Sequence, residues 1–335
     1  PLTVGSCGAL SPSQQVPLVW PWSLKTIMPI TPGKLIILYK WLLTAQPTTA
    51  AVDITQRCNL RCVHCYWWKQ EHPPELSDRQ MLAFLEGLRR RGLRAAILYG
   101  GEPTLRMGIC MAASKLFDAT LIFTNGTNGF PALGSGQWIL SLDGPEELND
   151  RIRGSGVYQE ATQALSKAPA PPVVHMTLSR LNMDGLEDFV GDMMDRPIKG
   201  IGFSFYTPQV GRDESACFIP LHQRDLLVKR LLRLRERYGE KIGFTPAMGR
   251  QLLSHGHFSK WNRFSACPVS KRVLCFQSNG QAKACTYGDD VDCSRCGCAA
   301  VAAYRGAFKP FDYSTLRVIL GLMVPEFRVP VGGVR

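Results

Sequence analysis

Apolar and polar positions alternate along the chain in a way that predicts strands followed by helices from about residue 51 onward. Short apolar runs typical of buried strands occupy residues 51–55, 95–99, 120–124, 138–142, 173–178 and 200–206. The clearest helix covers residues 77–91, where a capping box of Ser77 and Gln80 precedes an apolar face. Strands alternating with helices indicate parallel βαβ units. The pattern predicts an α/β fold, a TIM-like partial (β/α)6 barrel with its chemistry at the strand C-terminal ends.

Residues 1–50 are expected to form an irregular N-terminal segment. Prolines exclude a long helix there, at positions 12, 17, 21, 29 and 32. The apolar stretch 34–43 is shorter than the about 20 residues that span a bilayer, so it either packs on the domain or makes weak contact with a membrane surface. The N-terminus lacks the pattern of a secretory signal, and we therefore expect a cytoplasmic protein, with peripheral membrane association as the alternative.

The chain carries 39 Lys and Arg against 27 Asp and Glu, a net charge of +12. Ten basic and only three acidic residues fall within residues 221–265, which we interpret as a basic helical linker with a solvated face. RNA binding by this stretch is the alternative. Aromatic residues are not interleaved with its basic ones, which disfavours nucleic acid, and DNA is not an expected partner.

Three of the twelve cysteines follow the first predicted strand with the spacing C-x3-C-x2-C, namely Cys58, Cys62 and Cys65. A structural zinc site favours four ligands in pairs, and only His64 is available locally as a fourth. Three thiolates on a 4Fe-4S cube leave one iron free for a ligand that is not protein. The spacing therefore favours an open, catalytic cluster.

Further polar motifs end the next three predicted strands. Gly100-Gly101-Glu102-Pro103 follows the second strand, Thr124-Asn125-Gly126 the third, and Ser141-Leu142-Asp143-Gly144 the fourth. With the cysteine motif, this order resembles the radical S-adenosylmethionine (radical SAM) family over about residues 51–206. The resemblance implies that Cys58, Cys62 and Cys65 hold a 4Fe-4S cluster whose free iron takes SAM.

The resemblance also implies roles for the residues around the cluster. Gly100 and Gly101 would let the backbone approach the methionine amino group, Glu102 would accept a hydrogen bond from that group, and Pro103 would stiffen the turn. The remaining expected SAM or substrate contacts are Thr124, Asn125, Ser141, Asp143, Arg153, which would pair with the SAM carboxylate, and His64, which would stack on the adenine. Asp143 is equally typical of a turn, and Arg153 of a helix cap.

The second cysteine cluster starts at Cys267 and continues through a predicted hairpin with Asn279-Gly280 at its turn. Its C-x12-G-x4-C element resembles the SPASM or twitch extension of radical SAM enzymes. We expect one auxiliary 4Fe-4S cluster, held by Cys267, Cys285, Cys293 and Cys296 with Cys298 as a substitute, and a structural zinc site is the alternative. The other cysteines, 7, 110 and 217, are expected to be ordinary thiols, with Cys275 a spare.

These observations predict five regions: residues 1–50, a barrel over 51–220, the linker 221–265, the Fe-S extension 266–300 and a tail 301–335. The expected activity is reductive cleavage of SAM to a 5′-deoxyadenosyl radical, which abstracts hydrogen from a peptide, metabolite or lipid. A flavodoxin- or ferredoxin-like donor would supply the electron. The alternatives are an RNA-modifying radical SAM enzyme and an Fe-S electron-transfer or scaffold protein without SAM chemistry.

Overall fold

A computed structural model describes residues 31–44, 46–212, 215–255, 267–308 and 311–323. Its contacts separate residues 1–30, which lie outside these ranges, from residues 31–335. The expected irregular segment and Cys7 therefore fall largely or wholly outside the description, as does the linker beyond residue 255.

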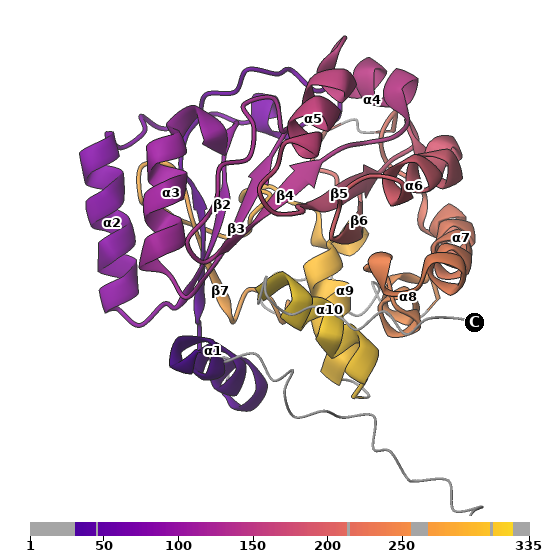
Figure 1. Ribbon diagram of the computed structural model, residues 1–335. Coiled ribbons are helices and arrows are strands. Elements are labelled where there is room, and N and C mark those ends of the chain that lie inside the picture. Colours follow the sequence, from indigo (N-terminus) through magenta and orange to yellow (C-terminus); the bar gives the residue numbers. More distant parts are fainter. Residues whose placement is uncertain (1–30, 45, 213–214, 256–266, 309–310, 324–335) are drawn as a thin grey trace, which may run out of the picture. The chain divides into compact units, whose positions relative to one another are not determined.

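All six predicted strands are present, and each pairs in parallel with the next one along the chain (Figure 1). They are β1 (Thr49–Asp53), β2 (Ala95–Tyr99), β3 (Ala119–Thr124), β4 (Gly136–Ser141), β5 (Val173–Leu178) and β6 (Gly200–Phe205). The predicted α/β class and partial barrel are confirmed. The first strand starts at Thr49, two residues before the predicted run, and Ile54 and Thr55 already belong to the loop that follows.

Helices cover the outer face of this sheet. They are α2 (Asp78–Arg90), α3 (Met107–Leu116), α4 (Glu146–Arg153), α5 (Val157–Ser166) and α6 (Leu186–Met194). The predicted capping box starts α2, because Ser77 Oγ accepts from the Gln80 amide and the Gln80 side chain accepts from the Ser77 amide. Met81 of α2, Ile109 of α3 and Val52 of β1 share one buried core. Alternate strand residues point the other way, so Ala51 and Tyr99 face the barrel interior.

The predicted hairpin is present, formed by β7 (Val273–Phe276) and β8 (Ala282–Lys283). Gly280 has φ +82°, and the Gln277 amide donates to the Gln281 carbonyl at 2.8 Å. The hairpin is not a separate layer, since β7 pairs in parallel with β1. The sheet therefore has eight strands in the order β6-β5-β4-β3-β2-β1-β7-β8.

The region after the barrel is mostly helical and consists of α7 (Leu221–Tyr238), α8 (Pro246–Leu252), α9 (Ala299–Phe308) and α10 (Tyr313–Met323). As predicted, α7 is amphipathic, with Leu227, Leu231 and Leu234 buried, but its Arg224 is buried too. The described part of the predicted tail packs on the barrel: α10 contacts β3 and β4, and Lys199 Nζ donates to the Gly321 carbonyl at 2.6 Å.

The apolar stretch 34–43 belongs to helix α1 (Pro32–Leu43). Ile37 packs against Ala95 and Ala119 at the start of β2 and β3, which is the packing alternative considered for this stretch. Leu35 and Tyr39 remain exposed. Among the described helices, none combines the length and apolarity needed to cross a membrane.

Candidate functional site

The cysteines of the C-x3-C-x2-C motif lie in the loop that follows β1, and all three are partly buried. The loop docks on the end of α4 through the Val63 amide, which donates to the Ile152 carbonyl at 2.8 Å. Burial raises the pKa of the Cys58 and Cys65 thiols to about 11, and neighbouring Cys62 adds to both shifts. The three thiols therefore share one short, partly buried segment.

Within the described ranges, no three His, Cys, Asp or Glu side chains are grouped so as to hold a metal ion. The donor set of the loop, three cysteine sulfurs on one short segment, is nevertheless of the soft type that iron-sulfur clusters use. Residues 58–65 thus fit a cluster by the chemistry of their donors.

Gly100 and Gly101 form the turn after β2, and the turn packs directly against the chain that leads into Cys58. The Gly101 amide donates to the Thr55 carbonyl at 2.9 Å, and a Cβ on either glycine would overlap backbone of residues 55–57. Gly100 also has φ +131°, a conformation that favours glycine. These glycines are required by the close approach of two backbone segments, whatever further contact they make with a cofactor.

The Glu102 carboxylate joins the ends of β2 and β3. It is buried, and its Oε1 accepts from the Thr104 amide and hydroxyl and from Thr124 Oγ1, while its Oε2 accepts from the Asn125 amide at 2.8 Å. Oε2 keeps a second lone pair that can accept from a further donor, as the predicted contact with the methionine amino group requires. Pro103 starts the short helical turn that follows, as expected of a stiffening residue.

Asn125 extends this network to the cysteine loop, because its Nδ2 donates to Asn59 Oδ1 at 2.9 Å. Asn59 follows Cys58 directly, so the end of β3 helps to hold the loop. The sequence analysis did not single out Asn59, although its place inside the cysteine motif was a signal. Ser141 ends β4 on the same face as Ile139, toward the barrel interior.

Asp143, Arg153 and His64 lie together beside the cysteine loop. Asp143 Oδ2 lies 2.6 Å from Arg153 and 3.2 Å from His64 Nε2, and Asp143 Oδ1 accepts from the Thr177 amide. Burial favours a neutral carboxyl, but the Arg153 guanidinium and His64 outweigh it and hold the pKa of Asp143 well below its usual range. Asp143 is thus engaged within the protein, and its contact with the ribose or the substrate stays a prediction.

Two atoms of this group remain available to a ligand. Arg153 Nε and His64 Nδ1 are buried and have no hydrogen-bond partner within the described part of the chain. Burial raises the pKa of Cys62, and the positive charge of Arg153 partly offsets this shift, so Arg153 acts electrostatically on the cysteine loop. A buried, unused guanidinium donor beside the loop fits an anionic group such as a carboxylate.

His175, which the sequence analysis passed over, lies on β5 inside the barrel. Its Nε2 is 3.0 Å from Ser204 Oγ on β6, and burial lowers the pKa of His175 to about 4, so the imidazole is neutral at pH 7. Phe123 packs against it edge-on. Its position as the one ionisable side chain of the predicted strand 173–178 could have marked it as a candidate.

The second set of cysteines surrounds the hairpin. Burial raises the pKa of Cys293, Cys296 and Cys298, and Cys267 and Cys285 each add a smaller effect in the same direction. Burial also raises the pKa of Cys275 on β7, and Cys285 and Cys267 add to this shift. Cys110 and Cys217 are buried, as expected of ordinary thiols.

Arg224 of α7 holds the loop that carries Cys296. Its guanidinium is fully buried and donates to the carbonyls of Tyr206, Arg295 and Cys296 at 2.9–3.2 Å, and burial lowers its pKa to about 10. Backbone bonds add to this attachment, since the Phe205 amide donates to the Gly297 carbonyl at 2.9 Å. Sequence analysis placed Arg224 on a solvated face, because its basic neighbours concealed a single inward-facing position.

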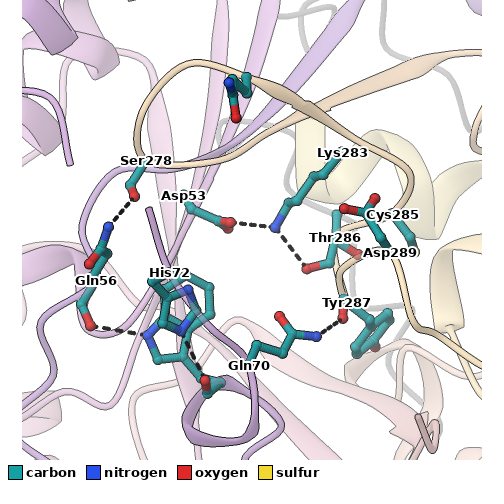
Figure 2. A network of polar contacts seen from close by, with 12 residues as sticks. Asp53, Gln56, Gln70, His72, Ser278, Lys283, Cys285, Thr286, Tyr287 and Asp289 are labelled. Atoms are coloured by element: carbon teal, nitrogen blue, oxygen red, sulfur yellow. Dashed lines mark hydrogen bonds and ion pairs between the residues drawn. The ribbon is translucent and has the colours of Figure 1, made fainter. Parts of the chain in front are cut away.

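Polar contacts join the first cysteine loop to the hairpin (Figure 2). Tyr66, next to Cys65, donates from its hydroxyl to the Thr286 carbonyl at 3.0 Å, and Gln70 Nε2 donates to the Tyr287 carbonyl at 2.9 Å. Asp53 at the end of β1 forms an ion pair with Lys283 of β8. The two cysteine regions are thus parts of one connected structure.

Comparison with known proteins identifies the class. Residues 52–178 match the family model of the Radical SAM superfamily. The sporulation killing factor maturation protein SkfB of Bacillus subtilis (strain 168) is 31% identical over 159 residues, 43% of this chain and 39% of SkfB. Pre-heme d1 synthase of Dinoroseobacter shibae is 34% identical over 122 residues, 32% of this chain and 30% of that protein. The chain thus matches well under half the length of these relatives.

Solved structures agree on the fold. Streptococcus suis SuiB bound to S-adenosylmethionine aligns with a TM-score of 0.56 and 14% identity over 75% of this chain and 63% of SuiB. Native anSMEcpe with bound AdoMet aligns with a TM-score of 0.57 and 13% identity over 84% of each chain. These structures show the partial-barrel fold, and the part of the chain that matches a family model, residues 52–178, matches that of radical SAM enzymes, which use a 4Fe-4S cluster and SAM. The cysteine-rich region after the barrel is consistent with the expected SPASM- or twitch-like extension.

Proposed function

We propose that the chain is a radical SAM enzyme that modifies a peptide or protein. The observation that carries this proposal is the C-x3-C-x2-C loop at the C-terminal end of β1, held beside the buried Asp143–Arg153 pair. The peptide substrate is supported by the relatives, since SkfB is described as a maturation protein and SuiB has been solved with its precursor peptide SuiA.

In this proposal the thiolates of Cys58, Cys62 and Cys65 hold the cluster. When bound, the cluster supplies the electron that cleaves SAM and so produces the species that removes hydrogen from the substrate. Arg153 Nε would donate to the SAM carboxylate, and His64, whose Nδ1 is likewise buried without a partner in the described residues, would contact the adenine. The other proposed contacts lie at the ends of β2, β3 and β4 and are Gly100, Gly101, Glu102, Pro103, Thr124, Asn125, Ser141 and Asp143.

The barrel interior orients the substrate and excludes water. Tyr99 and Phe123 stack with ring centroids 4.6 Å apart, and Phe123 also packs on His175. These rings make a largely apolar wall, and neutral His175 adds a hydrogen-bonding group to it. Burial raises the pKa of Tyr99 well above its ordinary value, so its hydroxyl stays protonated and can donate.

We further propose an auxiliary 4Fe-4S cluster on Cys267, Cys285, Cys293 and Cys296, with Cys298 as the substitute ligand. The contributions of Cys267 and Cys285 to the raised pKa values of Cys293, Cys296 and Cys298 support a shared site. A flavodoxin- or ferredoxin-like protein would be the electron donor. The sensitivity of such clusters to oxygen favours a reducing cytoplasm as the location.

Anaerobic reconstitution of the full chain tests the catalytic assignment. We expect about eight irons per chain, and the triple variant Cys58→Ala/Cys62→Ala/Cys65→Ala should retain about half and form no 5′-deoxyadenosine with dithionite and SAM. Cys110→Ala, which removes a buried thiol outside both sites, is the matched control and should keep all the iron. Formation of 5′-deoxyadenosine by the triple variant would show that the assignment is wrong.

The auxiliary site is tested by Cys267→Ala/Cys285→Ala. This variant should lose about four irons and still cleave SAM, since the first cysteine loop is intact. A wild-type chain with about one zinc and only about four irons would contradict the auxiliary cluster and support the structural zinc alternative.

A further inference from the structure

A cavity of about 460 Å³ opens between residues 67–73, the hairpin and residues 288–290. Its volume lies within the range of roughly 300–1000 Å³ that is usual for sites binding small molecules or side chains. Figure 2 shows the residues around it, which join the first cysteine loop to the hairpin. The cavity therefore borders both cysteine regions.

Asp53 and Lys283 line the inner part of this cavity as an ion pair, and each side chain is only 4% exposed. Lys283 Nζ binds Asp53 Oδ2 and also donates to the Thr286 carbonyl at 3.2 Å. The other carboxylate oxygen, Asp53 Oδ1, is buried and has no hydrogen-bond partner within the described part of the chain. A buried anionic oxygen without a donor is costly, and a ligand that donates to it would remove this cost.

The outer part of the cavity is acidic, with exposed Glu71, Asp289 and Asp290 among its lining residues. Among the described lining residues there are, with Asp53, four carboxylates against the two cations Lys283 and Arg212, so these residues carry a net charge of −2. The whole chain, by contrast, has a net charge of +12. A negative cavity on a basic protein selects positively charged ligands.

An aromatic wall completes the cavity. Trp67 and His72 both line it and stack with ring centroids 4.0 Å apart. Trp67 Nε1 donates to the Gln56 carbonyl at 3.0 Å, which fixes the indole. Trp67 is only 3% exposed and His72 covers one of its faces, so this ring pair offers apolar contact to the methylene groups of a bound side chain.

We propose that this cavity binds a lysine or arginine side chain of the peptide substrate, with Asp53 Oδ1 accepting from the cationic group and the acidic rim attracting it. The inference rests on the proposed function in that the ligand is a peptide. A side chain anchored here holds its backbone next to the segment that connects Cys65 to the hairpin, because Tyr66 is bonded to Thr286. The cavity thereby contributes to the choice and placement of the peptide.

Calorimetry on the anaerobically reconstituted full chain tests the charge preference. The probes are acetyl-Gly-Lys-Gly-amide, its Gln counterpart and n-butylammonium. We expect the Lys peptide to bind at least about tenfold more tightly than the Gln peptide. Its affinity should fall as the salt concentration is raised from about 50 to about 500 mM. Equal binding of the two peptides would overturn the proposal. Butylammonium binding as tightly as the Lys peptide would overturn the peptide as the source of the cation.

Variants locate the binding. Glu71→Gln/Asp290→Asn removes two exposed charges from the outer part of the cavity and should lower the affinity for the Lys peptide about three- to tenfold. The control Glu86→Gln/Asp195→Asn removes two exposed carboxylates outside the lining and should leave affinity unchanged. Asp53→Asn should reduce binding further, and the rim variant decides the matter if Asp53→Asn does not fold. Equal losses from rim and control variants would overturn the site, while cleavage of SAM without peptide reports separately on the proposed function.

Discussion

The two cysteine regions are built in different ways. In the first, all three cysteines lie within residues 58–65, and the contacts that hold the loop come from the ends of the neighbouring strands β2, β3 and β4. In the second, the cysteines are spread over residues 267–298, and α7 and the chain after β6 hold them. The first site is therefore specified mainly by a short motif, whereas the second depends on contacts between distant segments.

Their buried charges differ as well. Beside the first loop, Arg153 is neutralised by the carboxylate of Asp143. Beside the second, the Arg224 guanidinium is held by backbone carbonyl dipoles. A carboxylate can be protonated and a carbonyl cannot, so acid should weaken the support of the first region and leave that of the second largely unchanged. Four predictions, in order of decreasing effect, test this comparison.

The largest effect is expected for Asp143→Ala, which leaves Arg153 buried without its partner. The free energy of unfolding of the cluster-free chain, measured by urea denaturation without oxygen, should fall by about 3–5 kcal/mol. Because the folded pKa of Asp143 is lowered, its contribution is complete above about pH 4 and is lost as pH falls further toward the folded value. Asp143→Ala should therefore lose part of the acid dependence. An unchanged pH profile would contradict this role, and Asp143→Ala/Arg153→Met should recover part of the stability.

Arg224→Met should have the second largest effect. It should lower the free energy of unfolding by about 2–4 kcal/mol, because several buried carbonyls lose their donor. Hydrogen exchange should increase in residues 290–298 and stay unchanged in residues 58–65. Arg230→Met on the same helix removes a partly exposed pair with Glu187 and should cost less than about 1 kcal/mol. Faster exchange at both cysteine regions would show that the two are not independent.

Gly100→Ala probes the backbone approach in the first region. The positive φ and the overlap with Thr55 should lower the free energy of unfolding by about 2–3 kcal/mol. The control Gly108→Ala lies in α3 with open space around it and should be neutral or stabilising by up to about 1 kcal/mol. A cost below about 1 kcal/mol at Gly100 would mean that the turn is not constrained as described.

The smallest effect is expected in the hairpin turn. Gly280→Ala places a side chain in the left-handed backbone conformation, but the added methyl meets only side-chain atoms of Phe84 and Leu76, at ordinary or slightly tight contact. Thermal denaturation should show a loss of about 1 kcal/mol, less than at Gly100. A loss as large as that of Gly100→Ala would indicate that the second region is no more tolerant than the first.

Much of the fold could be predicted from the sequence because it depends on local rules. Strand periodicity, the capping box of Ser77 and the Asn279-Gly280 turn each need only a few consecutive residues. The same holds for the candidate site, since parallel strands bring their C-terminal ends to one edge and so gather Asn125, Asp143 and the cysteine loop.

Side-chain partners were harder to predict. The protein partners of Glu102 and Asp143 could not be read from the sequence, which predicted only their contacts with SAM or the substrate. Arg224 was concealed among basic neighbours, and only the packing of α7 buries it. A charged residue type shows that a charge is present, whereas its partner depends on which backbone groups the fold brings near it.

The sequence by itself determined the strand order of the barrel, the cysteine loop and the hairpin turn, because each follows from neighbouring residues. Only the tertiary structure decided that β7 joins β1, that Asp53 pairs with Lys283, and that an acidic cavity forms between the two cysteine regions. Asp53 and Lys283 are 230 residues apart in the chain. A contact of that separation exists only once the intervening barrel has folded, so no local pattern in the sequence encodes it.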